Sequence, residues 1–74
     1  MPHLITVLPV AENWIVRAPG LAEDLPFLSG AKAEAAARQL AGAAARTGRA
    51  AALEIYLRDG SLAGRIDYPA AIAA

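Results

Sequence analysis

The sequence contains no cysteine and a single histidine, His3, among its 74 residues. Without cysteine the chain cannot form a disulfide or a thiolate metal site. One histidine also excludes a multi-histidine metal site within one chain. A domain this small buries only about 60% of its unfolded surface, so disulfides, a metal or a partner chain usually supplement its core. Oligomerisation is the supplement that remains, and we therefore expect a homodimer.

An excess of charge is also absent, because seven Lys and Arg balance seven Asp and Glu. A neutral chain has no general electrostatic attraction to nucleic acid or to an anionic membrane. No apolar run approaches the roughly 18 residues of a membrane span, and the N-terminus lacks the basic and apolar regions of a secretory signal. These absences predict a cytoplasmic protein that does not enter a membrane.

Aromatic residues are scarce, at 5% of the chain, although 57% of the residues are hydrophobic. Alanine accounts for much of the difference, with twenty residues. Small side chains bury little area, so the few large ones matter more. Trp14 is the largest side chain present, and we expect it to anchor the core rather than to form a ligand platform.

Two apolar stretches, residues 4–10 and 13–18, flank a single polar break and predict a β-hairpin, with Pro9 near an edge or the turn. A two-residue turn would place Ile5, Val7 and Pro9 on the face that also carries Trp14 and Val16, and a three-residue turn would pair the opposite sets. In either register both faces stay mainly apolar, and one helix can cover only one of them. We expect the uncovered set to form a dimer surface. Its candidate residues are Leu4, Leu8, Val10, Ile15, Tyr56 and Ile72.

The segment from residue 18 to residue 30 contains glycine and two prolines, which argue against regular structure. Leu25, Phe27 and Leu28 are nevertheless too apolar for a free loop. Two interpretations stay open for this segment. It is a flap that closes one end of the core, or it is a mobile lid or a docking surface for a partner.

An alanine-rich helix is predicted from about Lys32 to Arg46. Ser29 or Gly30 would cap its N-terminus, and Gly48 suits the position just after its C-terminus. The apolar face, with helical spacing, consists of Ala33, Ala36, Ala37, Leu40, Ala41 and Ala44. These small side chains would let the helix lie close to a sheet. Glu34 and Arg38 have the spacing of a stabilising ion pair.

Residues 51–58 and 61–68 predict a second hairpin around Asp59-Gly60, the pattern of a type I′ turn. That turn sets a register with apolar pairs on the inner face and mixed pairs on the outer face. The inner pairs are Leu57–Leu62, Ile55–Gly64 and Leu53–Ile66, and the outer pairs are Tyr56–Ala63 and Glu54–Arg65. The predicted fold is an α+β domain in β-β-α-β-β order. It has a four-stranded antiparallel sheet with one helix on one face, spans residues 1–68, and is followed by a short apolar tail, residues 69–74.

No catalytic, cofactor or metal site emerges from the sequence. His3 lies near the N-terminus with no nucleophile that can be placed beside it, and Glu23-Asp24 has the pattern of a solvated turn. Arginines on the helix and on the last strand suggest the alternative hypothesis, a weak nucleic-acid-binding domain, although such surfaces usually carry more cations and stacking aromatics. The candidate contacts are Arg38, Arg46, Arg49 and Arg65. The leading hypothesis is a non-enzymatic homo-oligomeric interaction module without a cofactor.

Short motifs across residues 4–68 resemble a family of small uncharacterised bacterial proteins, domain of unknown function 2188. The matching positions are Trp14 and Val16, then Lys32, Glu34 and Ala35 with Leu40-Ala41, then Asp59-Gly60 and Tyr68. Two positions depart from the family pattern. Ala31 stands where a hydroxyl residue usually precedes the lysine, and the loop from Pro19 to Leu28 is longer and more apolar. The resemblance implies the same fold and supplies no activity and no catalytic residues.

Overall fold

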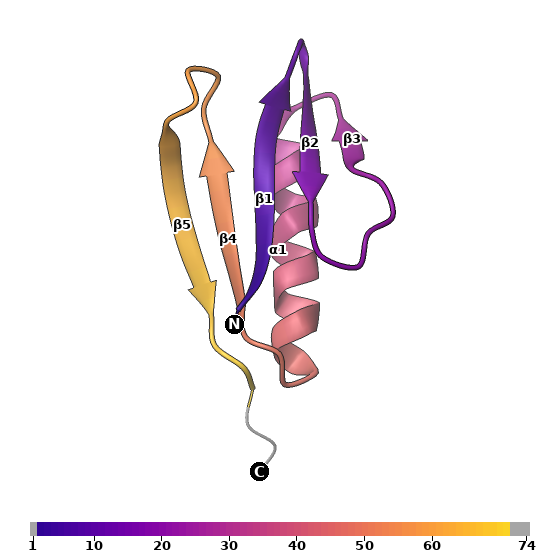
Figure 1. Ribbon diagram of the computed structural model, residues 1–74, viewed down its shortest axis with the longest axis vertical. Coiled ribbons are helices and arrows are strands. Elements are labelled where there is room, and N and C mark those ends of the chain that lie inside the picture. Colours follow the sequence, from indigo (N-terminus) through magenta and orange to yellow (C-terminus); the bar gives the residue numbers. More distant parts are fainter. Residues whose placement is uncertain (1, 72–74) are drawn as a thin grey trace.

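The first strand of the chain, β1 (His3–Val10), lies at the centre of a five-stranded mixed sheet (Figure 1). The computed structural model describes residues 2–71. The other elements are β2 (Asn13–Arg17), β3 (Leu25–Phe27), α1 (Gly30–Arg46), β4 (Ala51–Tyr56) and β5 (Leu62–Tyr68). The strands lie in the order β3-β2-β1-β4-β5, and only the β1–β4 pair is parallel. The expected α+β class with one helix on one sheet face is therefore confirmed for these residues.

The predicted four-stranded antiparallel sheet is wrong in two respects. First, α1 carries the chain back along the sheet, so β4 starts beside the start of β1, with His3 opposite Ala51, and runs parallel to it. Second, residues 25–27 form a fifth strand, in which Pro26 pairs with Ile15 of β2. A proline is compatible with this position because β3 is an edge strand and half of its backbone groups need no partner strand.

The first hairpin has the two-residue turn, which leaves Val7 opposite Val16 and Pro9 opposite Trp14. Ala11 takes a φ of 54° at the first turn position, a left-handed conformation that is costly for alanine. Pro9 lies beyond Val7, the last residue of β1 that pairs with β4. Its missing N–H therefore interrupts no pairing in the centre of the sheet.

The turn of the second hairpin differs from the prediction. The Gly60 N–H donates to the Leu57 carbonyl (3.0 Å), and the Leu57 N–H donates to the Ser61 carbonyl (2.9 Å). Gly60 has a φ of 87° while Asp59 does not have a positive φ, so a type I′ turn is excluded and the loop has three residues. A bulge at Ala63 then restores the expected register. Glu54 faces Arg65, Ile55 faces Gly64 and Leu53 faces Ile66, whereas Tyr56 faces Leu62 and the two pairs predicted nearest the turn are wrong.

The helix begins at Gly30, two residues before the predicted start, and the Ser29 hydroxyl accepts a hydrogen bond from the Lys32 N–H (3.2 Å). At its C-terminus the Gly48 N–H donates to Ala45 and the Arg49 N–H donates to Ala44, which is a Schellman motif. Both predicted caps are therefore confirmed.

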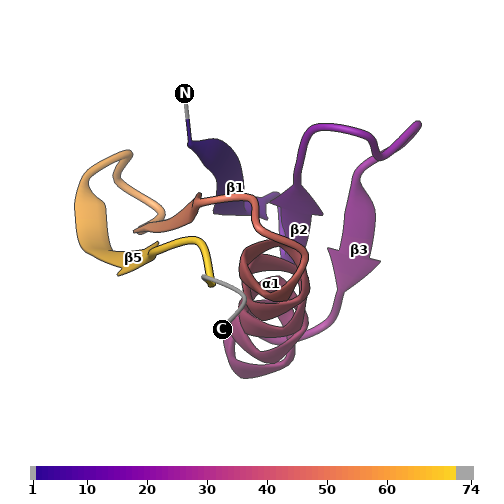
Figure 2. The ribbon, with the colours of Figure 1, turned by 90° about the horizontal axis from the view of Figure 1, so that it is seen from below.

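The core lies between α1 and the inner face of β1, β2 and β4. The fully buried large side chains are Ile5, Val7, Val16 and Leu53. The helix contributes only alanines to the buried set, namely Ala33, Ala37, Ala41 and Ala45. Because these side chains are short, the helix packs close to the sheet, as the sequence predicted. Figure 2 shows α1 against one face of the sheet and no described element against the other.

Candidate interaction surface

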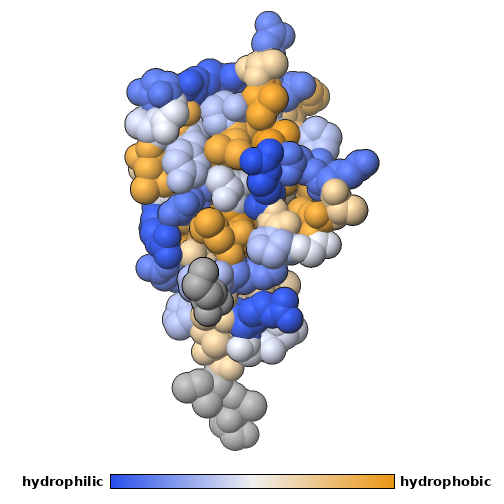
Figure 3. Space-filling view, in the orientation of Figure 1, coloured by the Kyte–Doolittle hydropathy of each residue, from blue (hydrophilic) through white to orange (hydrophobic). Residues whose placement is uncertain are grey.

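The sheet face that points away from α1 carries most of the residues that the sequence nominated. Side chains alternate along a strand, so Leu4, Thr6, Leu8 and Val10 project opposite to the buried Ile5 and Val7 of β1. We call this surface the open face. Its principal members are Leu4, Thr6, Leu8, Val10, Ile15, Arg17, Ala52, Glu54, Tyr56, Arg65 and Asp67. Figure 3 shows that hydrophobic residues on this side of the molecule are interrupted by hydrophilic ones.

The apolar part of the open face lies over β1 and β2. Leu8 and Ile15 are directly opposite each other across the two strands, and both are half-buried. Leu4 is 41% exposed and Val10 is 48% exposed at the two ends of β1. Val7 pairs with Ile55, so the next residues along these parallel strands, Leu8 and Tyr56, lie beside each other. Five of the six predicted interface residues therefore share one face, and the sixth, Ile72, lies outside the described residues.

The polar part of the open face lies over β4 and β5. The Tyr56 hydroxyl donates to Glu54 Oε1 (2.9 Å), and Arg65 Nη1 donates to Glu54 Oε2 (2.8 Å). Arg65 Nε also donates to Asp67 Oδ1 (3.2 Å). The hydrogen bond to Glu54 raises the pKa of Tyr56, so this phenol keeps its proton at neutral pH. A neutral tyrosine and paired charges provide recognition groups but no activated nucleophile or base.

One border of the open face is held by a bidentate ion pair. Arg17 Nη2 and Nε lie 2.9 and 3.1 Å from the two carboxylate oxygens of Asp24. The Arg17 guanidinium lowers the pKa of Asp24 through these hydrogen bonds. This pair ties the loop before β3 to the end of β2. Phe27 packs against the core, as a flap would, but Leu28 remains 87% exposed.

The candidate nucleic-acid contacts do not form one surface. Arg38 pairs with Glu34 on the helix (3.5 Å), and Arg46 is in its last turn. Arg65 instead lies on the sheet face opposite to α1, where it is bound by two carboxylates. The structure therefore separates the helical arginines from Arg65.

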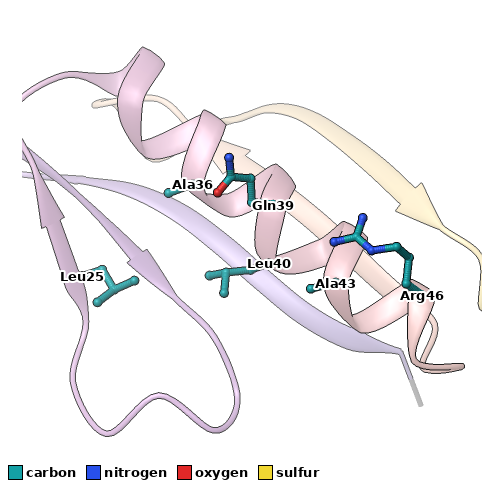
Figure 4. Close-up of a pocket in the computed structure, with 6 residues that line it drawn as sticks. All are labelled: Leu25, Ala36, Gln39, Leu40, Ala43 and Arg46. Atoms are coloured by element: carbon teal, nitrogen blue, oxygen red, sulfur yellow. The ribbon is translucent and has the colours of Figure 1, made fainter.

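A groove between the helix and β3 was not predicted from the sequence. It has a volume of about 570 Å³, and its lining consists of Leu25, Ala36, Gln39, Leu40, Ala43 and Arg46. Figure 4 shows Leu25 facing the helix from β3, with the other five residues on α1. The groove exists because β3 pairs beyond β2, and the short alanine side chains leave the space between the two elements unfilled. The lining offers apolar contact and no nucleophile.

Trp14 closes the end of the core where the helix begins. A Cβ placed on Gly30 would lie 3.2–3.5 Å from three atoms of the Trp14 ring, so the indole packs directly against the first turn of α1. The Arg58 guanidinium stacks over the same ring, 5.3 Å from its centroid, and donates to the Ala11 carbonyl. Trp14 is therefore a core anchor, as predicted. The contact with Arg58 was missed because it joins two separate hairpin turns.

Residues 2–71 contain no group of three or more His, Asp or Glu side chains placed to hold a metal ion. His3 is half-buried at the start of β1, where its backbone N–H donates to the Ala50 carbonyl (2.7 Å). Within the same residues, no helix is both long and apolar enough to cross a membrane.

Comparison of the chain with protein-family models, curated proteins and solved structures gives no significant match. The resemblance to domain of unknown function 2188 therefore stays a prediction. The class that fold and surface define is a small α+β domain in which no described element covers one face of the sheet.

Proposed function

We propose that this protein is a non-enzymatic, homo-oligomeric interaction module of the cytoplasm, and that the apolar part of the open face, over β1 and β2, is its dimer interface. The observation that carries the proposal is the row of apolar side chains on a sheet face that no second layer covers within residues 2–71. Leu4 and Val10 are each more than 40% exposed there, beside Leu8 and Ile15. Sheets that bury such a face against another layer gain the hydrophobic stabilisation that a short chain lacks.

A second copy of the chain is a suitable occupant because a two-fold dimer uses the same patch twice. Each substitution on the patch is then also present twice. Full burial of a leucine or isoleucine side chain is worth about 1.5–3 kcal/mol. Leu8 is only partly exposed in one chain, so replacing it in both copies would remove at most roughly 1–2 kcal/mol from the dimer, before any charge repulsion.

The experiment compares the solution masses of variants by size-exclusion chromatography with light scattering over a range of concentrations. Leu8→Lys and Ile15→Lys each place a charge at the centre of the patch. Leu28→Lys makes the same chemical change at an 87% exposed leucine outside the open face. We expect the wild type and Leu28→Lys to associate equally strongly through the open face, and the dissociation constant of that contact to be at least tenfold higher in the two patch variants.

Unfolding would also abolish a dimer, so circular dichroism must show that each variant retains its helix and thermal transition. Val10→Lys provides a milder second test, because Val10 is 48% exposed at the end of β1 and a lysine there has room in the monomer. Folded patch variants that associate as strongly as the wild type at every concentration would refute the proposed interface. A monomeric wild type would refute the proposed function.

Nothing in the geometry favours nucleic-acid binding as a second function, since the helical arginines and Arg65 lie on opposite sides of the sheet. The discriminating measurement is binding to single-stranded and duplex DNA at low salt. Affinity that falls steeply with salt would revive this alternative.

A further inference from the structure

The two edges of the sheet are protected to different degrees. Natural proteins prevent unwanted strand pairing with short edge strands, prolines, charges and bulges. The edge strand β3 has three residues and a central proline, Pro26. The other edge strand, β5, has seven residues and no internal proline. Among the described residues no strand pairs with the outer side of β5, so its backbone groups there are available to another strand.

The part of β5 that can pair regularly with another strand is centred on Ile66. The bulge at Ala63 interrupts the pairing with β4 near the turn, and from Gly64 to Tyr68 the pairing is regular. These five residues are symmetric about Ile66. An antiparallel second copy of β5 with its two-fold axis at Ile66 would thus use the whole regular stretch.

We propose that the free edge of β5 is a second interface, at which β5 of a second copy pairs antiparallel about Ile66 and extends the sheet across both chains. This register places Arg65 opposite Asp67 of the second copy, and Asp67 opposite Arg65. The side chain of Asp67 is 72% exposed and that of Arg65 is 42% exposed, so both can reach across the edge. Opposite charges facing each other across paired strands stabilise the pairing.

Charge also selects this register over its neighbours. A two-fold axis at Arg65 would place two arginines opposite each other, and an axis at Asp67 would place two aspartates opposite each other. With the axis at Ile66, a row of side chains crosses the strands on the open face, from Glu54 of β4 to Arg65 of β5 and then to Asp67 of the second copy. Acidic and basic side chains alternate along this row. Glu54 already holds the Arg65 guanidinium at 2.8 Å, which orients it on the same face as Asp67.

On the sheet face toward α1, the side chains of the two paired β5 strands are also complementary in this register. Gly64 would lie opposite Tyr68 of the second copy, on the face that both share with Ile66. A Cβ added at Gly64 would meet no atom within 4 Å, so this position is open in the single chain. An aromatic ring facing an edge glycine covers its bare backbone, a known device in β-sheet pairing. The edge thus offers charge complementarity on one face and an aromatic cover on the other.

Single-cysteine variants test the register, because the natural chain has no cysteine. Ile66→Cys would place two thiols opposite each other, where Cβ atoms of antiparallel strands are about 4.5–5.5 Å apart. Leu62→Cys is the matched control on the same strand. It lies four residues from the axis, so its thiols would be separated by roughly eight residues of strand, on the order of 27 Å. We expect mild oxidation to cross-link Ile66→Cys and to leave Leu62→Cys monomeric on gels.

Asp67→Arg tests the charge pairing without an introduced cysteine. The substitution places an arginine opposite Arg65 of the second copy. Glu12→Arg is its control, with the same charge change in the exposed turn between β1 and β2. We expect Asp67→Arg to raise the dissociation constant of the edge pairing at least tenfold and Glu12→Arg to leave it unchanged. Circular dichroism must show that each variant, including Ile66→Cys, remains folded.

The edge interface does not depend on the open face, and the two proposals fail in different ways. The double variant with Ile66→Cys and Leu8→Lys should still form the disulfide cross-link through β5. Loss of the open-face contact lowers the solution mass of the assembly but leaves this cross-link intact. Cross-linking of folded Ile66→Cys no faster than that of Leu62→Cys, at concentrations up to the millimolar range, would overturn the edge proposal whatever the mass of the wild type. An unchanged association of Asp67→Arg would overturn the register centred on Ile66.

Discussion

The glycine in the middle of the helix should be replaceable with a gain in stability. Glycine in a helix interior costs about 0.5–1 kcal/mol relative to alanine. A Cβ at Gly42 would meet only Arg46 Nη1, at 3.3 Å, which is the flexible end of an exposed side chain. Because the guanidinium can move aside, Gly42→Ala should raise the free energy of unfolding by about 0.5–1 kcal/mol. For a domain of this size that is a rise of roughly 2–8 °C in melting temperature.

Gly30→Ala is the matched counterpart in the first turn of the same helix. Its Cβ would press on the Trp14 ring at 3.2–3.5 Å, and the indole is held between the helix and Arg58. Overpacking of this kind typically costs about 1–3 kcal/mol, which outweighs the gain in helix propensity. Urea denaturation at fixed protein concentration, with equal slopes for both variants and the wild type, measures the differences. If Gly42→Ala failed to stabilise the protein, or Gly30→Ala stabilised it, the packing assigned to the two helix faces would be refuted.

Three further substitutions act on the turns. Ala11→Gly should stabilise the first hairpin by up to about 1 kcal/mol in thermal unfolding, because Ala11 has a φ of 54° that glycine adopts without strain. Arg58→Ala should lower the free energy of unfolding by about 0.5–1 kcal/mol, and it should also change the fluorescence of Trp14, the only tryptophan. Hydrogen bonds from the hydroxyl and N–H of Ser61 lower the pKa of Asp59 in the folded state. Their stabilisation is therefore present above the unfolded pKa, near 3.9, and is lost as pH falls through the folded pKa. Asp59→Ala should flatten the dependence of stability on pH below about pH 4, and an unchanged acid profile would contradict this assignment.

The local elements of the fold could be predicted because each has its own sequence signal. Ser29 and Gly48 delimit the helix, and the apolar runs of the two hairpins define their strands. The parallel pairing of β1 with β4 could not be predicted, because no local pattern states which distant strands become neighbours. The three residues of β3 were missed for a related reason. Pro26 argues against a strand unless its backbone lies at an edge, and only the tertiary pairing with Ile15 shows that it does.

The turn of the second hairpin shows a limit of motif reading. Asp-Gly suits a two-residue type I′ turn, yet Gly60 also serves at the left-handed position of a three-residue loop. The Asp59 carboxylate accepts hydrogen bonds from both the N–H and the hydroxyl of Ser61, which stabilise the longer loop. The pairing of Glu54 with Arg65 was nevertheless predicted correctly, because the bulge at Ala63 offsets the extra loop residue.

The candidate surface was predictable to the extent that strand alternation determines it. Once the turn between β1 and β2 is known, alternation alone places Leu4, Leu8 and Val10 on the face opposite to the core. The groove along α1 and the stacking of Arg58 on Trp14 depend on contacts between segments that are distant in the sequence. No periodicity encodes such contacts, so both were missed.

The two proposed interfaces occupy different strands, and this separation leads to a joint prediction. Leu8 lies on β1 and Asp67 lies on β5, with β4 between them. Substitutions at sites without shared contacts usually have additive effects. If the two-fold axes of the two interfaces are perpendicular and intersect, the chains close into a four-chain assembly with about four times the 7.6 kDa of one chain. Each single variant, Leu8→Lys or Asp67→Arg, should then reduce the assembly to a dimer, and the double variant should be a folded monomer. Light scattering distinguishes these masses directly. A single substitution that takes the wild-type assembly straight to monomer would mean that both residues belong to one interface, because only a shared interface is lost as a unit.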